Sequence, residues 1–306
     1  MALVKKNKSR KKRTIGELIF DIILYVLFGV FTIMCIFPFY YIFINTISDN
    51  NLVATGRITL FPSGIHFQNY INVFKLSTIP PAALVSLGRT VIGTLVTIIA
   101  ASFPAYAFTR EEFWCRKFWY RFIIVTMYFS AGIIPMFLTY KMLGIYNTFF
   151  VYVLPSIVTP FNLILCKTYI ESLPASLEES AEIDGAGYLV RYFKLILPLS
   201  KPILATIAIF SAVGQWNNFT DTVLYVIDKK LFTLQYVLYD YLNRANAVIE
   251  LMRTDPTMID AGVTTQLSEL TVKYTICIVT VLPIILVYPF FQKFFVKGIM
   301  IGAVKG

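Results

Sequence analysis

Long uncharged stretches of the chain alternate with short polar segments. A membrane-spanning helix needs about 18 or more consecutive residues with few or no charges, because an unpaired charge is costly in hydrocarbon. The interval 58–74 is shorter and contains Pro62 and Gly64, so we expect it to lie outside the membrane core. Six intervals between consecutive charged residues are long enough, and they predict transmembrane helices at 22–48, 90–109, 122–140, 142–166, 202–220 and 274–292.

The same pattern predicts the order of segments along the chain. Within its larger helical part, polar loops cover 171–199 and 221–270. The expected order is a tail over 1–16, a first span within 17–48, a segment outside the membrane over 49–84, a helical domain over 85–298 and a second tail over 299–306.

Composition agrees with a membrane protein and excludes several other classes. The chain of 306 residues is 57% hydrophobic and only 14% charged, whereas soluble domains carry roughly 25% charged residues. Four scattered cysteines do not form a disulfide scaffold, and a single histidine, His66, leaves little for metal or acid–base chemistry. We therefore expect neither a metal site nor catalytic residues in this chain.

The distribution of positive charge predicts the orientation. Of the 27 Lys and Arg residues, 18 lie in the first tail, the 110–121 loop, the 167–201 loop and the C-terminal segment. Because basic residues accumulate in cytoplasmic loops, we expect both termini inside the cell. The uncharged run 22–48 exceeds the 7–15 residues of a signal peptide, so the basic tail is interpreted as a retained anchor that touches anionic lipid, and not as a nucleic-acid site.

Two long stretches then lie outside the membrane, at 49–89 and 221–273. The second contains an apolar and aromatic run over 231–239, which predicts a short helix on the membrane surface. Two interpretations stay open for these stretches: a lid over the outer helix ends, or a docking surface for an external partner.

The cytoplasmic segment 167–201 departs from the basic trend, since it holds five acidic residues against four basic ones. Its pattern predicts two short helices with a sharp turn at Gly185 and Gly187. Ser176 and Glu179 have the spacing of a capping box, and we expect Pro198 to end the second helix. So acidic a loop indicates a partner other than lipid.

This segment carries a resemblance. Glu179-Ser-Ala181, then Gly185, then Leu197-Pro198 is similar to the EAA loop of permease subunits in binding-protein-dependent ABC importers. The flanking residues look like the carbohydrate-uptake branch, specifically the second permease of maltose-type and oligosaccharide importers. Further blocks at 105–110, 130–135 and 288–298 extend the resemblance over nearly the whole chain.

The resemblance implies a fold, a location and partners. The fold is an all-α integral membrane protein with six transmembrane helices and an EAA helix-turn-helix, the MetI-like fold of type I importer permeases. The location is the bacterial cytoplasmic membrane. The partners are a paired permease, two ATP-binding subunits, an extracytoplasmic solute-binding protein and a sugar, which we expect to be an oligosaccharide. ATP and Mg²⁺ belong to the ATPase, in keeping with a sequence that has no G-x-x-x-x-G-K-[ST] phosphate loop, and this chain binds no cofactor itself.

Two sets of site residues follow. The resemblance implies ATPase coupling through Glu178, Glu179, Ala181, Glu182, Asp184, Gly185, Ala186, Gly187, Leu197 and Pro198. The polar cluster in the fifth span, with other polar groups near span ends, suggests a substrate path over Gln215, Trp216, Asn217, Asn218, Tyr41, Asn45 and Tyr128. Amides bond sugar hydroxyls and an indole covers a sugar ring, but the same amides also join membrane helices to one another.

Two other classes of protein fit part of the pattern. An ion-coupled secondary transporter also has multiple spans, yet it commonly carries ionisable groups within them, and the six uncharged intervals contain none. A membrane-embedded enzyme would need a cluster of titratable residues at membrane depth, whereas His66 lies in a loop.

Overall fold

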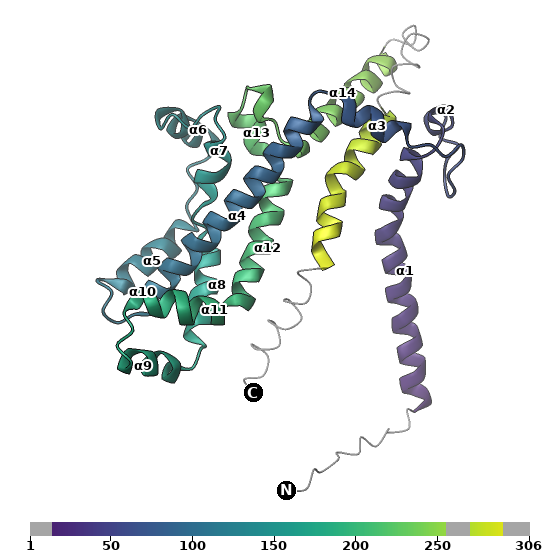
Figure 1. Ribbon diagram of the computed structural model, residues 1–306. Coiled ribbons are helices and arrows are strands. Elements are labelled where there is room, and N and C mark those ends of the chain that lie inside the picture. The colour runs from purple at the N-terminus through teal and green to yellow at the C-terminus, as the bar shows by residue number, and fades with distance from the viewer. Residues whose placement is uncertain (1–13, 255–269, 290–306) are drawn as a thin grey trace.

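The computed structural model describes residues 14–254 and 270–289, and all of their regular structure is helical (Figure 1). The predicted tail 299–306 and most of the tail 1–16 lie outside these residues, as do parts of the 221–270 loop and of the last predicted span.

The first part of the chain is dominated by two long helices. Its elements are α1 (Ile15–Thr46), α2 (Asn50–Ala54), α3 (Gln68–Lys75), α4 (Ile79–Thr109), α5 (Arg116–Thr126) and α6 (Ile133–Met142).

The second part consists of shorter helices and ends in an unlabelled apolar helix, Leu270–Pro289, which is yellow in Figure 1. The preceding elements are α7 (Phe150–Val153), η1 (Leu154–Ser156), α8 (Pro160–Glu171), α9 (Ala175–Ile183), α10 (Tyr188–Arg191), η2 (Tyr192–Ile196), α11 (Leu197–Leu199), α12 (Lys201–Asn217), α13 (Thr220–Tyr225), η3 (Lys229–Leu231) and α14 (Leu234–Thr254).

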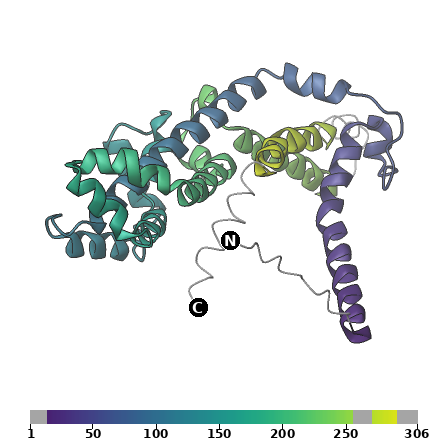
Figure 2. The ribbon, with the colours of Figure 1, turned by 60° about the horizontal axis from the view of Figure 1, so that its bottom comes forward.

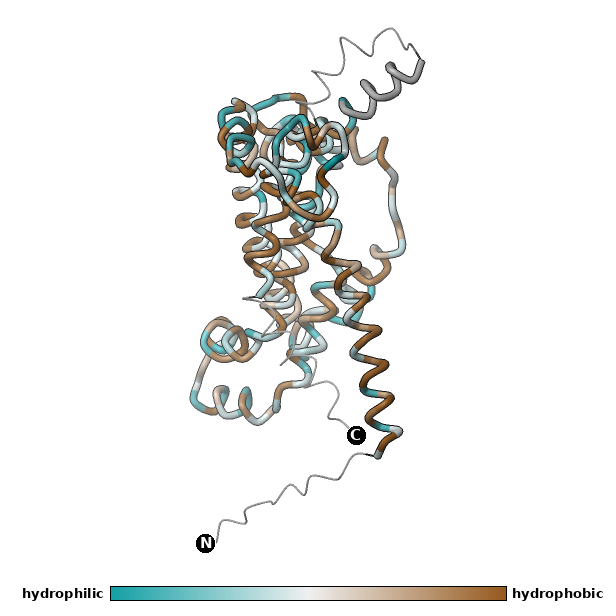
Figure 3. The backbone as a smooth tube through the Cα atoms, turned by 90° about the vertical axis from the view of Figure 1, so that its right-hand side faces the viewer, coloured by the Kyte–Doolittle hydropathy of each residue, from teal (hydrophilic) through white to brown (hydrophobic). Residues whose placement is uncertain are grey.

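Helix α1 stands apart from the body of the protein, as Figures 1 and 2 both show. It begins with a capping box between Thr14 and Glu17. None of its most apolar 18-residue window is buried, and Figure 3 shows the helix as almost uniformly hydrophobic. Only its last turn is buried, at Ile44, Asn45 and Thr46. A helix apolar on all sides without protein around it requires lipid or another subunit.

Helix α4 is the centre of the body and packs against both α12 and α8. Near its C-terminal end, Ala101 and Ala105 let the neighbouring helices approach closely, and they join a buried cluster with Leu163 and Cys166 of α8 and Ile207 of α12. This arrangement makes α4 the one helix that extends from the α3 end of the body to the α9 end (Figure 1).

The predicted spans are recovered to different degrees. Among the described residues, α1, α4 and the helix Leu270–Pro289 are each long and apolar enough to cross a membrane. Two further candidates are bent pairs: Phe150–Ser156 with Pro160–Glu171, at 48°, and Tyr188–Leu199 with Lys201–Asn217, at 77°. They correspond to the predicted spans 142–166 and 202–220.

The predicted span 122–140 is wrong as a continuous helix. Helix α5 ends at Thr126 and α6 begins at Ile133, and the residue before α6, Gly132, has a φ of +83°. The apolar composition of this interval does not reveal that its backbone leaves the helix between the two.

The predicted surface helix at 231–239 is also different in extent. A helix begins at Leu234, but it is α14 and continues to Thr254. Its first turns are not free on a surface, because Leu234, Val237 and Leu238 are buried with Trp216 of α12 and Ile276 of the last helix. Helix α14 therefore covers the ends of these two helices.

Candidate functional site

The acidic segment forms the two predicted helical arms at one end of the body, called here the α9 end (Figure 1). Helix α9 ends at Ile183, and Gly185 follows with a φ of +77°, a left-handed conformation that favours glycine. The predicted capping box is wrong, since the N-cap of α9 is Pro174 and no side chain caps the helix. Pro198 does not end the second arm either; helix continues through α10, η2 and α11 to Leu199, and the chain bends after it.

Glu178 joins α9 to the last turn of α4. The residue is 9% exposed, and its Oε1 accepts a 2.8 Å hydrogen bond from the Tyr106 hydroxyl. The same oxygen forms an ion pair with Arg110, and Nη1 of Arg191 lies 3.9 Å away. Arg191 also bonds Oε2 of Glu182 at 2.9 Å, which ties α10 to α9. Two acids and two arginines thus hold both arms against α4.

The remaining predicted coupling residues surround this group of ion pairs between Glu178, Glu182, Arg110 and Arg191. Glu182 is an exposed member of it, Ala181 and Ala186 are half-buried at the turn, and Leu197 is half-buried on α11. The exposed residues are Glu179, Asp184, Gly185, Gly187 and Pro198. A polar hollow of about 250 Å³ beside α9 is lined by Glu171, Glu178, Glu179 and Glu182 with Arg110. The outward surface of α9 and its turn is consequently acidic and free of side chains from the described residues that would cover it.

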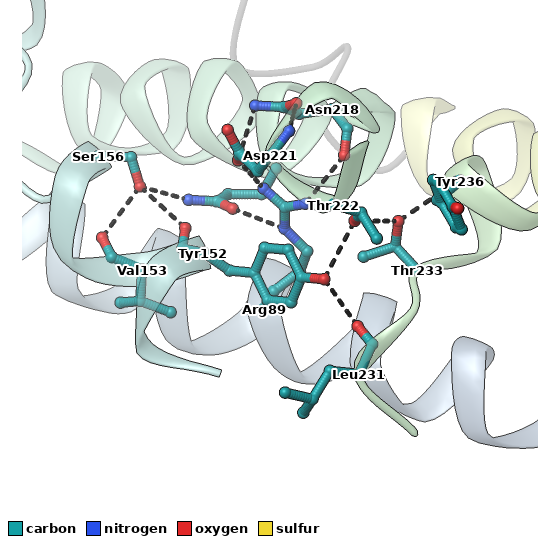
Figure 4. A network of polar contacts seen from close by, with 11 residues as sticks. Arg89, Tyr152, Val153, Ser156, Asn218, Asp221, Thr222, Leu231, Thr233 and Tyr236 are labelled. Atoms are coloured by element: carbon teal, nitrogen blue, oxygen red, sulfur yellow. Dashed lines mark hydrogen bonds and ion pairs between the residues drawn. The ribbon is translucent and has the colours of Figure 1, made fainter. Parts of the chain in front are cut away.

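A second polar cluster surrounds Arg89 (Figure 4). Arg89 lies in the interior of α4 and is 1% exposed. Its three nitrogens bond three acceptors: Nε donates to Oε1 of Gln215 at 3.0 Å, Nη1 to the carbonyl of Asn218 at 2.8 Å, and Nη2 to Oδ2 of Asp221 at 2.8 Å. The guanidinium also lies 4.4 Å from the ring centroid of Tyr152. A buried arginine is stable only when paired and hydrogen-bonded, and this one meets both conditions.

Further bonds anchor this Arg89 cluster to neighbouring elements (Figure 4). Nε2 of Gln215 donates to Oγ of Ser156 at 2.6 Å, so η1 is attached to α12. The Tyr152 hydroxyl donates to the Leu231 carbonyl at 2.7 Å and lies 3.0 Å from Oγ1 of Thr222. Burial, and then the Asp221 carboxylate, raise the pKa of Tyr225 at the end of α13, so that phenol stays neutral.

Sequence reasoning missed Arg89 because the predicted span was started at the residue after it. The helix in fact begins at Ile79, so Arg89 lies in its interior, although the predicted interval 90–109 itself contains no ionisable group. The available signal was a basic residue at the end of one uncharged interval and an acidic residue, Asp221, at the end of another. Charges of opposite sign in these places suggest a pair between two helices.

The predicted substrate residues fall into separate places. Gln215 and Asn218 belong to the Arg89 cluster, whereas Asn217 is exposed on α12. Trp216 is 7% exposed, and its Nε1 donates to the Thr280 carbonyl at 2.9 Å, so its indole packs against the last helix.

The other three residues of the predicted path are not brought to this cluster. Tyr41 meets Tyr274 edge to face near the end of α1, and the Asn45 amide donates to the Tyr41 carbonyl of its own helix. Tyr128 lies between α5 and α6 and is 82% exposed. Within the described residues, no group of three or more His, Cys, Asp or Glu side chains is placed to hold a metal ion.

Comparison with known proteins gives concordant results. The family described as "Binding-protein-dependent transport system inner membrane component" matches residues 93–301. The chain is 35% identical to the polygalacturonan/rhamnogalacturonan transport system permease protein YtcP of Bacillus subtilis (strain 168), over 94% of this chain and 99% of that protein. It is 25% identical to the arabinooligosaccharides transport system permease protein AraQ of Halalkalibacterium halodurans, over 91% and 94% of the two chains.

A solved structure has the same fold. It is the crystal structure of a bacterial ABC transporter involved in the import of the acidic polysaccharide alginate, one chain of which aligns with a TM-score of 0.82 and 31% sequence identity. The alignment covers 93% of this chain and 99% of that one.

Proposed function

Because this chain belongs to the family of binding-protein-dependent transport system inner membrane components, we propose that it is a permease subunit of an ATP-driven importer and forms half of the path for a sugar. An extracytoplasmic binding protein delivers the sugar, and a second, homologous permease supplies the other half of the path. The chain is a transport component of the membrane, and the ATP is hydrolysed by separate subunits.

The observation that carries this proposal is the pair of helical arms locked onto α4. Their outer face presents Glu179, Asp184 and the Gly185 turn, and their inner face is fixed by Glu178 and Arg191. A rigid projection with a free acidic surface suits docking into a basic cleft of an ATPase. Movement of the ATPase would then displace α4 as a rigid body through the Glu178 contacts.

The proposed orientation follows from the basic residues. With both termini in the cytoplasm, the α9 end faces the ATPases and the opposite end faces the binding protein. Arg89 lies 20 residues before the last residue of α4, which corresponds to roughly 30 Å along a helix. That distance equals the thickness of the hydrocarbon core, so the Arg89 cluster belongs near the outer surface.

We propose an oligosaccharide as the transported sugar. The similar proteins act on polygalacturonan or rhamnogalacturonan, on arabino-oligosaccharides and on alginate. Their substrates differ in charge and in monomer, and what they share is the chain of linked sugars. An ion-coupled secondary transporter has no support among these proteins, although Arg89 shows that an ionisable group inside a helix is present.

Reconstitution tests the proposed function. The chain is purified with its paired permease, the ATPase and the binding protein, and placed in liposomes with an oligosaccharide digest of pectin outside. We expect uptake to have two requirements. One is ATP on the side of the membrane where the ATPase lies, and the other is the binding protein. Uptake by this chain alone, driven by an ion gradient, would instead establish the secondary transporter.

A further inference from the structure

A pocket of about 520 Å³ opens between α8 and α12, beside the Arg89 cluster. Its volume lies within the roughly 300–1,000 Å³ usual for small-molecule sites. Its wall includes Arg89 and Gln215 of that cluster, together with Phe161, Phe210, Ser211, Gly214, Asn218 and Asp221. The pocket combines apolar walls with a few convergent polar groups, which is the general composition of a ligand site.

The polar wall has an unused acceptor. Oδ2 of Asp221 already accepts from Arg89 at 2.8 Å and from the Asn218 amide at 2.9 Å. Oδ1 accepts no hydrogen bond from any described residue, and the Asp221 side chain is 25% exposed. The three nitrogens of Arg89 and the Gln215 amide are each already bonded to protein acceptors. The wall therefore offers a free acceptor at Oδ1 of Asp221 beside the hydroxyl of Ser211 and the amide of Asn162. It suits a ligand with hydroxyl groups, which both donate and accept hydrogen bonds.

The charge of the wall narrows the ligand class. Arg89 and Asp221 neutralise each other across 2.8 Å, so the wall has no net formal charge to attract a cation. A carboxylate would meet the exposed oxygen of Asp221, and the three nitrogens of Arg89 behind it are already bonded to protein acceptors. A neutral ligand bearing hydroxyl groups satisfies Oδ1 without an unpaired charge.

The apolar wall suits one face of a ring. Phe161 and Phe210 have ring centroids 6.4 Å apart at 38°, and they are 48% and 45% exposed. Aromatic faces carry partial negative charge and attract the polarised C–H groups that line one face of a pyranose. Gly214 also lines the pocket, one helical turn after Phe210, and a Cβ atom there would have no heavy atom within 4 Å.

We propose that this pocket binds one sugar unit of the transported oligosaccharide through its hydroxyl groups, with Asp221 as acceptor and the two phenylalanines as the apolar wall. Arg89 acts as a positioning residue, since its 2.8 Å ion pair orients Asp221. The proposal rests on the proposed function and adds to it a place of contact with the hydroxyl groups of one sugar unit.

Gly214→Leu tests the pocket by filling it. The backbone at Gly214 needs no left-handed conformation and the new side chain meets open space, so the fold should tolerate the change. The matched control is Gly29→Leu in α1, another helical glycine with nothing within 4 Å of its Cβ. Each variant is reconstituted with the full set of subunits, and uptake from the pectin digest is measured per ATP hydrolysed.

We expect Gly214→Leu to lower the sugar taken up per ATP by about tenfold, the effect of losing one good contact, and Gly29→Leu to leave it unchanged. Asp221→Asn, which keeps the shape of the side chain, should lower it by a smaller factor. Arg89→Lys retains the charge, but its single nitrogen cannot bond the three acceptors that three separate guanidinium nitrogens hold, so it should lower uptake per ATP while the amount of assembled complex stays the same.

Three results would overturn the proposal. Equal uptake per ATP in Gly214→Leu and the unmodified complex would show that no sugar enters the pocket. Loss of the paired permease from purified Gly214→Leu would show that a subunit contact fills it. An Arg89→Lys effect limited to the amount of complex would make Arg89 purely structural. Absence of ATP-dependent uptake by the unmodified complex, by contrast, counts against the proposed function itself.

Discussion

Gly93 of α4 lies directly against Gln215 of α12, a member of the Arg89 cluster. A Cβ atom at position 93 would lie 2.7 Å from Nε2 of Gln215 and 2.9 Å from its Cδ. The Gln215 amide is held at both ends, by Arg89 and by Ser156, so it has no free direction in which to move. The absence of a side chain at 93 is therefore a condition for the cluster to form.

Gly93→Ala should destabilise the permease by about 1–3 kcal/mol, because it displaces Gln215 and leaves buried polar groups without partners. Gly88→Ala is the matched control on the same helix, where the new Cβ would meet the Phe149 ring at an ordinary 3.6 Å. Replacing a helical glycine with alanine at a tolerant site gains about 0.5–1 kcal/mol. Thermal unfolding of the two detergent-solubilised variants should thus shift in opposite directions, and equal shifts would show that Gln215 moves freely.

Glu178→Gln and Glu179→Gln should separate stability from docking. Glu178 is buried among Tyr106, Arg110 and Arg191, so removing its charge leaves two arginines less well paired and loosens the arms from α4. Breaking a buried pair costs up to about 3–5 kcal/mol, and the partial exposure of Arg110 reduces that figure. Glu179 faces outward, so its substitution should spare unfolding and weaken the ATPase interaction.

Unfolding temperature and co-purification of the ATPase are the two measurements for this pair of variants. The interpretation given to Glu178 fails if Glu178→Gln unfolds like the unmodified protein. The docking surface proposed for α9 fails if Glu179→Lys, a full reversal of charge, retains the ATPase and normal uptake.

Gly185→Ala should reduce transport strongly without removing the protein from the membrane. Its Cβ would meet no heavy atom within 4 Å, so the penalty is the left-handed φ of +77° alone, about 1–2 kcal/mol for a residue with a side chain. Gly187 also has open space but a φ of −68°, and Gly187→Ala is the matched control. Uptake and ATP hydrolysis by the assembled complex are compared, and an equal loss in both variants would implicate space at the docking surface instead of the turn.

Trp216→Ala should impair the fold before it impairs transport. Its indole is buried and joined to Thr280 of the last helix, and removal of a buried tryptophan costs about 3–5 kcal/mol. Asn217→Ala, at the exposed neighbouring position, should leave unfolding unchanged. The amount of permease recovered with its partner is measured alongside uptake, and a Trp216→Ala complex that assembles normally but fails to transport would restore a substrate role for this residue.

The apolar helices and the acidic arms could be located from the sequence. Which of their side chains are buried and which residues contact one another could not. Charges flank most helices, so the uncharged intervals located α1, α4 and Leu270–Pro289, although the predicted starts of α1 and α4, at 22 and 90, lie 7 and 11 residues after the observed ones at Ile15 and Ile79. The break before α6 escaped because hydropathy reports composition and not backbone conformation, and Gly132 is one of many glycines in the chain. Spacing also placed Glu178 and Glu179 together, although one is buried and the other exposed.

The Arg89 cluster was harder to predict for a different reason. Its strongest bond joins residues 132 positions apart, and no local pattern contains both of them. Gln215 and Asn218 were singled out by their polarity within an apolar stretch, but their chief partner was excluded by the rule used to find the spans. A rule that starts each span after the last charged residue necessarily overlooks a charge that lies inside the helix and is neutralised there.

One helix connects the two polar sites. Arg89 and Arg110 lie at the two ends of the same stretch of α4, roughly 30 Å apart, and each is bonded to a different helix of the body. Between them, Pro104 is where the helix lacks one backbone donor and can bend. A tilt of α4 imposed at the arms must either reach the pocket or be absorbed by bending at Pro104. The stiffness of the helical turn at Pro104 therefore sets how strongly a movement at one face of the membrane is coupled to a movement at the other.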